Sequence, residues 1–234
     1  MAETAAVPRA PDARVDLHCH TNASFDGVSD PVALVARAAE RGLTHLAITD
    51  HETLDGAVRA RDAAPSTLTV LIGCEVHTRD GDLVFVFLDH PIGRDLPARE
   101  AIEAGRAQGA LVGIPHPYDP TRRSLLLRPD TEELVSMVDW VEVWNGRVTR
   151  RAVNERAAAL ASRLGVPGVG VSDAHALIEA GRAYTVMSGD PATAPGLLAA
   201  LRGKLTIVGD EPVAATGRLT RLLRRGAGPV EAAR

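Results

Sequence analysis

Cysteine, aromatic residues and long apolar runs are all scarce in this chain of 234 residues. Its two cysteines, Cys19 and Cys74, cannot form a framework of disulfides, and we interpret both as small buried residues in a reducing compartment. No stretch approaches the roughly 20 consecutive apolar residues that span a bilayer. Residues 1–14 lack the basic start and apolar core of a secretory signal. We therefore expect a cytoplasmic protein with no membrane partner.

An excess of positive charge is also absent. The chain carries 26 Lys and Arg against 30 Asp and Glu, a formal net charge of -4, which argues against a general nucleic-acid-coating role. The length suffices for one full core, and no internal repeat or long linker divides it. We expect a disordered lead-in over residues 1–13, one domain over 14–209, and a basic helix with a frayed tail over 210–234 that is peripheral to the chemistry.

What the chain does contain is a series of short apolar runs rich in Val, Ile and Leu, bounded by turn-forming residues. Such runs are typical of buried strands. They cover residues 14–20, 44–51, 68–76, 82–90, 110–117, 140–146 and 168–175.

Most of these runs are separated by helical patterns. The clearest has Asp30 as its N-cap, Pro31 at its first position and Gly42 past its end. Similar patterns cover residues 98–109, 130–138, 150–165 and 191–203. Alternation of strand and helix predicts parallel strands in an α/β fold, either a barrel or a doubly wound sheet. The pair Asp80-Gly81 predicts a tight hairpin that breaks the regular pattern.

Metal-type ligands collect at the carboxyl ends of five runs. Side chains alternate along a strand, so His18 and His20 should face one way and Cys19 the other. Active sites of α/β barrels are assembled at this end of the strands. Imidazole and carboxylate without a sulfur pattern suit Zn, Mn or Fe in a catalytic cluster. The residues at these run ends are His18, His20, His51, Glu75, His116, Asp173 and His175.

Two other histidines have a weaker claim to the cluster. His45 starts its run and should lie at the opposite rim, which indicates a structural role. His77 alternates in step with Glu75 and could face the same side, although a ligand role is the less favoured reading.

The order of the motifs resembles the PHP family, the polymerase and histidinol phosphatase domain. The resemblance extends from about Arg14 to Gly209, and "EVWNGR", "NERAAALASRLGVP" and "AYTVM" are most similar to stand-alone members related to nucleotide and oligonucleotide phosphoesterases. It implies a distorted (β/α)7 barrel with a metal site at the carboxyl ends of the strands. The motifs that carry it are "DLHCHTNAS" followed by Asp26, then "AITDH", "GCEV", "IPHP" and "GVSDAH".

The resemblance also implies a centre of two or three divalent ions, Zn, Mn or Fe. His18, His20, Glu75 and Asp173 would hold one ion. Glu75 would bridge to a second ion that His116 also binds, and Asp26, His51 and His175 would hold the third. Stand-alone relatives often carry a histidine after the hairpin turn, where this chain has Asp82. Either Asp82 or His90, at the end of its run, could complete the second site.

Such a centre suits hydrolysis of phosphate esters by a metal-activated water. Anionic substrates need cations nearby, and guanidinium groups match phosphate geometry. Arg122 and Arg123 follow the fifth run and are our candidates for substrate binding, while Arg147 and Asn145 follow the sixth and are weaker candidates.

The leading hypothesis is thus a metal-dependent phosphoesterase acting on a small phosphorylated molecule, a nucleotide or a short oligonucleotide, with no obligatory protein partner. Two alternatives stay open. One is a phosphomonoesterase of the histidinol-phosphate type, although the chain is shorter than that branch suggests. The other is a metal-binding accessory module of a polymerase without turnover, although the chain contains no polymerase segment.

Overall fold

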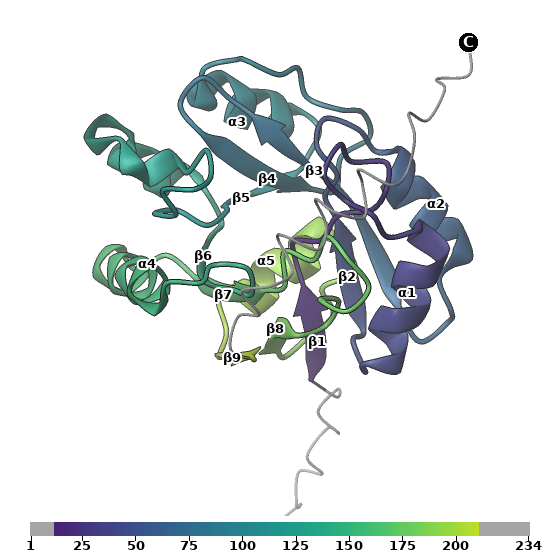
Figure 1. The fold of residues 1–234 in the computed structure, drawn as a ribbon. Helices are drawn as coiled ribbons and strands as arrows, with labels where there is room; N and C mark the ends of the chain where they lie inside the picture. The colour runs from purple at the N-terminus through teal and green to yellow at the C-terminus, as the bar shows by residue number, and fades with distance from the viewer. Residues whose placement is uncertain (1–11, 211–234) are drawn as a thin grey trace, which may run out of the picture.

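A computed structural model describes residues 12–210 of the chain. The predicted lead-in over 1–13 therefore lies almost wholly outside the described residues, and the predicted basic helix and tail over 210–234 does so except for residue 210. The described residues form an α/β fold (Figure 1). It contains nine strands, five α-helices and two 3-10 segments.

One sheet of nine strands organises this part of the chain, in the order β7-β6-β5-β4-β3-β2-β1-β8-β9. The strands β1 to β3 are parallel to one another, as are β5 to β7, whereas β4, β8 and β9 run antiparallel to their neighbours. The strands are β1 (Ala13–Asp16), β2 (His45–Ile48), β3 (Thr69–His77), β4 (Asp82–Val86), β5 (Leu111–Ile114), β6 (Trp140–Asn145), β7 (Gly168–Val171), β8 (Ala183–Met187) and β9 (Leu205–Gly209).

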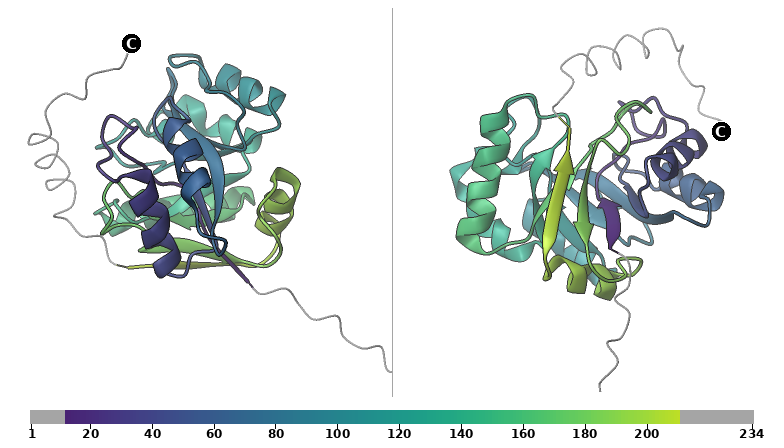
Figure 2. Two further views of the ribbon diagram at one scale, coloured as in Figure 1. Left: turned by 90° about the vertical axis from the view of Figure 1, so that its right-hand side faces the viewer. Right: turned by 90° about the horizontal axis from the view of Figure 1, so that it is seen from below.

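The sheet curls into a nearly closed barrel. The segment after β1 pairs with the segment after β7 through a bridge between Cys19 and Ala174. A second contact that helps to close the barrel links β8 to β7. The Thr185 hydroxyl of β8 accepts from the Gly170 N–H of β7 at 2.8 Å and donates to the Gly170 carbonyl at 3.0 Å. β9 forms one edge of the sheet, and its residues are largely exposed (Figure 2).

The helices α1 to α4 lie around the outside of the sheet, whereas α5 lies within the outline of the barrel (Figure 1) and packs against the apolar cluster that fills it. That cluster takes side chains from β1 to β8, with Trp140 its largest fully buried member. The helical elements are α1 (Pro31–Glu40), α2 (Asp55–Ala63), α3 (Ala98–Ala107), η1 (Leu125–Leu127), η2 (Pro129–Met137), α4 (Arg151–Leu164) and α5 (Ala194–Leu201).

Most predicted elements are confirmed. Asp30 caps α1 by accepting from the N–H groups of Val32 and Ala33, and Gly42 follows the helix with a φ of 79°. The hairpin at Asp80-Gly81 joins β3 to β4. The differences are few: 129–137 forms 3-10 turns rather than an α-helix, α2 was not predicted, and β8 and β9 add strands beyond the seven apolar runs.

Candidate metal centre

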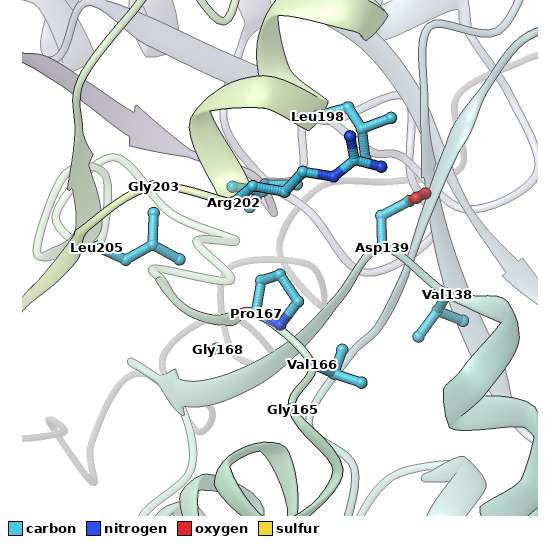
Figure 3. Close-up of a pocket in the computed structure, with 11 residues that line it drawn as sticks. Val138, Asp139, Gly165, Val166, Pro167, Gly168, Leu198, Arg202, Gly203 and Leu205 are labelled. Atoms are coloured by element: carbon cyan, nitrogen blue, oxygen red, sulfur yellow. The ribbon is translucent and has the colours of Figure 1, made fainter.

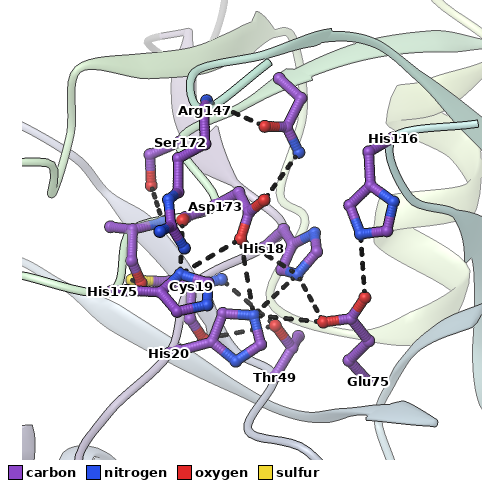
Figure 4. A network of polar contacts seen from close by, with 12 residues as sticks. His18, Cys19, His20, Thr49, Glu75, His116, Arg147, Ser172, Asp173 and His175 are labelled. Carbon is purple, nitrogen blue, oxygen red and sulfur yellow. Dashed lines mark hydrogen bonds and ion pairs between the residues drawn. The ribbon is translucent and has the colours of Figure 1, made fainter. Parts of the chain in front are cut away.

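The histidine and carboxylate side chains predicted for the metal site converge at one end of the barrel (Figure 4). Three groups of them place one potential ligand atom each within 4.8 Å of one another. These groups are His20, Asp26, His51 and His175; then His18, His20 and Asp173; and then Glu75, Asp82 and His116.

His18 and His20 lie just past the end of β1 and face the same point. Their Nε2 atoms are 2.9 Å apart, while Cys19 between them is buried in the core on the other side. The backbone here is fixed on two sides, because the His20 N–H donates to Ala174 and the Thr49 N–H donates to Cys19. The alternation predicted from the sequence is confirmed.

Glu75, in β3, lies at the centre of the cluster and is 1% exposed. Its Oε2 atom is 3.1 Å from His18 Nε2 and 3.2 Å from His20 Nε2. Its Oε1 atom is 3.1 Å from His116 Nε2. The two oxygens of one carboxylate thus face two different sets of imidazoles, which is the arrangement a bridging ligand requires.

Asp173 offers one oxygen to the cluster and uses the other for support. Its Oδ2 atom accepts from Asn145 Nδ2 at 3.1 Å and pairs with Arg122 Nη1 at 2.9 Å. Its buried Oδ1 atom has no hydrogen-bond partner among residues 12–210 and lies 3.6 Å from His20 Nε2. Both Asp173 and His116 have positive φ angles, 50° and 28°, so strained backbone turns their side chains toward the site.

Asp26 lies between two histidines of the remaining group. Its Oδ2 atom is 2.9 Å from His175 Nε2 and 3.4 Å from His51 Nε2. The Nδ1–H of His175 donates to the Asp173 backbone carbonyl at 2.9 Å, which directs Nε2 of that ring toward Asp26.

The choice between Asp82 and His90 is clear in the geometry. β4 is antiparallel to β3, so its first residue, Asp82, lies beside the cluster and its far end points away. His90 is exposed beyond that far end. The position of His90 at the end of its run therefore places it away from the three groups, whereas Asp82 belongs to one of them. His77 contacts two residues of the groups: its Nδ1 lies 2.7 Å from Asp82 Oδ1, and its ring centroid lies 4.7 Å from that of His51.

Glu142 is a member of the site that the sequence reasoning missed. It lies in β6 and is 1% exposed. The His18 Nδ1–H donates to its Oε1 at 2.6 Å, and its Oε2 accepts from the His116 N–H and from Asn145 Nδ2, both at 2.8 Å. A carboxylate behind a ligating histidine fixes the ring and its tautomer. The only available signal was an acidic residue inside the apolar run "WVEVWNG".

The electrostatics of the cluster favour a cation. Burial acts to lower the pKa of His18, but Glu142, Glu75 and Asp173 raise it well above its ordinary value. In the same way Glu75 and Asp26 outweigh burial and raise the pKa of His51 to about 9. The buried carboxylates therefore attract additional positive charge, and Oδ1 of Asp173, which accepts no hydrogen bond within residues 12–210 and faces three imidazoles at 3.4–3.7 Å, is available as a ligand atom. These residues fit two or three divalent ions.

The candidate arginines differ in how they approach the site. Arg122 reaches into it and pairs with Asp173, and its side chain is 23% exposed. Arg147 is more buried and lies 3.5 Å from Glu179 through its Nε. Arg123 lies at the hairpin, where its Nη2 donates to the Thr78 carbonyl at 2.7 Å and its Nε lies 3.5 Å from Asp82 Oδ1. Of these three arginines, Arg122 makes the shortest ion pair to a carboxylate of the three groups.

A separate pocket of about 620 Å³ lies at the opposite end of the barrel (Figure 3). It opens where β7 and β9 begin, and Pro167, Leu198 and Leu205 line it together with the Arg202 side chain. The Asp139 carboxylate at its edge already pairs with Arg106 at 2.7 Å and accepts from the Val112 N–H at 2.8 Å. The predicted chemistry is not located there.

The helices among residues 12–210 are all too short or too polar to cross a membrane. His45 begins β2, at the end of the barrel away from the cluster, as predicted. Its Nδ1 contacts the Thr44 hydroxyl at 2.9 Å, which agrees with a structural role.

Comparisons with known proteins agree with this architecture. An uncharacterized protein of Methanocaldococcus jannaschii is 34% identical over 143 residues, covering 56% of this chain and 81% of the relative. A two-domain protein from Bacteroides vulgatus that contains a predicted PHP-like metal-dependent phosphoesterase superposes with a TM-score of 0.72 at 19% identity, over 85% of this chain and 65% of the other. A lesion-specific endonuclease from Pyrococcus furiosus gives 0.64 at 17% identity, over 84% and 58%. This chain thus spans less than two thirds of either solved protein.

Family profiles cover most of the described residues. The profile of the PHP domain matches residues 16–138, and that of the PHP-associated segment matches residues 151–205. The first match begins at the residue before "LHCH" and contains seven of the residues in the three candidate groups, His18, His20, Asp26, His51, Glu75, Asp82 and His116. The chain belongs to the PHP domain family.

Proposed function

We propose that this protein hydrolyses phosphate esters of small phosphorylated molecules, including nucleotides and short oligonucleotides, with two or three divalent ions. The observation that carries the proposal is the position of Glu75, whose two carboxylate oxygens lie 3.1 Å from histidines of two different groups. Metal ions held a few ångströms apart by such a bridge suit phosphoester chemistry.

The residues present divide naturally among the ions. One ion would be held by His18, His20, Glu75 and Asp173, a second by Glu75, Asp82 and His116, and a third by Asp26, His51 and His175. When bound, such ions hold phosphoryl oxygens, lower the pKa of water and stabilise charge on the entering and leaving oxygens. The set of imidazoles and carboxylates without thiolate suits Zn, Mn or Fe.

The chain's other residues would hold these ligands and the substrate in place. Glu142 orients the His18 ring, and Asn145 and Arg122 hold Oδ2 of Asp173 so that Oδ1 faces the centre. Arg122 and Arg147 would pair with phosphoryl oxygens, because the guanidinium fork matches their geometry. Arg123 has a weaker claim, since its guanidinium is engaged at the hairpin.

The similarity to a lesion-specific endonuclease supports a substrate with a nucleotide component. The test is hydrolysis of a panel that includes a nucleoside monophosphate, a dinucleotide and histidinol phosphate, with added Mn or Zn. Release of inorganic phosphate measures hydrolysis of the two monoesters, and chromatography of the nucleoside and nucleotide products measures hydrolysis of the dinucleotide. Selective turnover of histidinol phosphate would favour the monoesterase alternative. Metal binding without turnover of any ester would favour the accessory module and contradict the proposal.

Two variants make the test specific to the site. Asp173→Asn should keep the fold but nearly abolish turnover, because the anionic oxygen that faces His18, His20 and His175 is lost. Asp89→Asn is the matched control, since Asp89 is exposed at the far end of β4. Circular dichroism checks that both variants fold. Equal turnover in wild type and Asp173→Asn would overturn the mechanism.

A further inference from the structure

Phe25 is an aromatic side chain that the fold leaves in solvent. All seven Phe, Trp and Tyr residues of the chain lie among the described residues. The residue Phe25 is 60% exposed, whereas the other six are buried or partly buried. By contrast Phe85 and Trp140 are fully buried. Burying an aromatic side chain is among the larger hydrophobic gains available to a fold. An exposed phenyl ring in a chain so poor in aromatics therefore calls for a reason.

The residues on either side of Phe25 fix its position at the metal centre. The Ser24 hydroxyl donates to Asp26 Oδ1 at 3.0 Å, and Asp26 Oδ2 lies 2.9 Å from His175 Nε2. The phenyl ring itself stacks on the His51 ring, with centroids 4.7 Å apart and planes inclined by 25°. The ring is thus held by site residues, and the part that does not cover His51 faces solvent.

The guanidinium group of Arg122 contacts the cluster at a different residue from the one that Phe25 contacts. His20 lies between the two approaches, because its ring centroid is 4.8 Å from that of His51 and its Nε2 is 3.6 Å from Asp173 Oδ1. Phe25 contacts the cluster at His51, and Arg122 contacts it at Asp173. A flat apolar surface and a guanidinium group are therefore both present at one metal centre.

We infer that Phe25 is a stacking platform for the base of a nucleoside phosphate whose phosphoryl group lies at the metal centre beside Arg122. This inference rests on the proposed function and narrows its substrate class to esters that carry a nucleobase, over sugar or polyol phosphates. Bases stack on aromatic side chains with little sequence preference. Phe25 therefore determines specificity for the presence of a base and not for its identity.

The test compares two ligands that differ only in the base. Methylenephosphonate analogues of adenosine 5′-monophosphate and ribose 5-phosphate resist hydrolysis, so their binding to the metal-loaded protein can be measured by calorimetry without turnover. Wild type should bind the nucleotide analogue about tenfold tighter or more, given the usual strength of base–aromatic stacking. Phe25→Leu should remove that preference, whereas Phe25→Tyr, which keeps the ring, should retain it.

Leu127→Ala is the matched control, because Leu127 is another exposed apolar residue, at 44%, outside the cluster. It should leave both affinities unchanged. Equal binding of the two analogues by wild type, or no binding of either, would overturn the inference. Equal weakening of both by Phe25→Leu would also overturn it and assign Phe25 to covering His51. If the preference is found but no ester is hydrolysed, the proposed function fails and this inference stands.

Discussion

Single residues at strand ends carry most of the predicted chemistry, because a short motif contains both the ligand and the strand that positions it. The pairs His18 and His20, and Asp173 and His175, could be recognised for this reason. Glu142 could not, because its role depends on long-range contacts from β6 to His18 and His116. A lone glutamate in an apolar run does not reveal which imidazole lies beside it.

Glu142→Gln tests that long-range contact. The substitution keeps the shape but removes the charge that orients and polarises His18, so we expect metal affinity to fall about 10- to 100-fold. Competition with a chromophoric chelator measures the change. Glu132→Gln, at an exposed residue whose ion-pair partner within the described range 12–210 is Arg163, should have no effect. Unchanged affinity in Glu142→Gln would show that His18 is positioned without its carboxylate partner.

Asp82 and His90 give a second prediction at this scale. Asp82→Ala should lose one ion selectively, because Asp82 lies with Glu75 and His116 in one group of potential ligands. His90→Ala should keep all ions, because His90 is exposed beyond the far end of β4. Elemental analysis of both purified variants measures the outcome. Selective loss in His90→Ala, or in neither variant, would show that the second site is completed differently.

At the scale of elements, the seven apolar runs all form strands, since their composition and their turn-forming borders agree. The helix α2 was missed because its N-cap residue, Leu54, makes no side-chain cap, so the usual start signal is absent. The sequence marks β8 only through the family motif "AYTVM", and no apolar run predicts β9. Antiparallel strands at the end of an α/β chain interrupt the alternation on which the prediction relied.

Thr185, in β8, allows a test of how the sheet closes. Its hydroxyl pairs with both backbone groups of Gly170 in β7. Thr185→Val keeps the shape but leaves that buried N–H and carbonyl unpaired, so we expect unfolding free energy to fall by about 1–3 kcal/mol. Urea denaturation measures it. Thr206→Val, on the exposed face of β9, should change stability by less than about 0.5 kcal/mol. Equal stability of the two variants would contradict this account of closure.

At the scale of the whole molecule, the sequence alone left a barrel and a doubly wound sheet as alternatives. Local patterns predict strands and helices in both. The difference lies in whether the segments after β1 and β7 meet, as Cys19 and Ala174 do here. The resemblance to the PHP family predicted the barrel, whereas the periodicity of the sequence does not indicate which distant segments meet.

The two buried cysteines predict how the stability of the whole fold depends on pH. Burial raises the pKa of the Cys74 thiol from 9.0 to about 12, and burial likewise raises the pKa of Cys19 well above its ordinary value. Between pH 9 and 12 the unfolded thiols lose protons that the folded thiols keep, so unfolding free energy should fall as pH rises. The slope is at most about 1.4 kcal/mol per pH unit for each thiol.

Urea denaturation at pH 8 and pH 10.5 measures this effect. Cys74→Ala should flatten the dependence relative to wild type, because the folded state then no longer holds that proton. Below pH 9 neither thiol should contribute, since both states remain protonated. A dependence as steep in Cys74→Ala as in wild type would mean that other groups govern alkaline stability.

The central claim is that these histidines and carboxylates form a multi-metal centre. The most direct measurement is the metal-to-protein ratio of the full chain, purified without chelators and analysed by inductively coupled plasma mass spectrometry. We predict two or three transition-metal ions per chain, because the cluster contains three groups of potential ligands linked by Glu75 and His20. Less than one ion per chain, with no increase when Mn or Zn is added, would contradict the account.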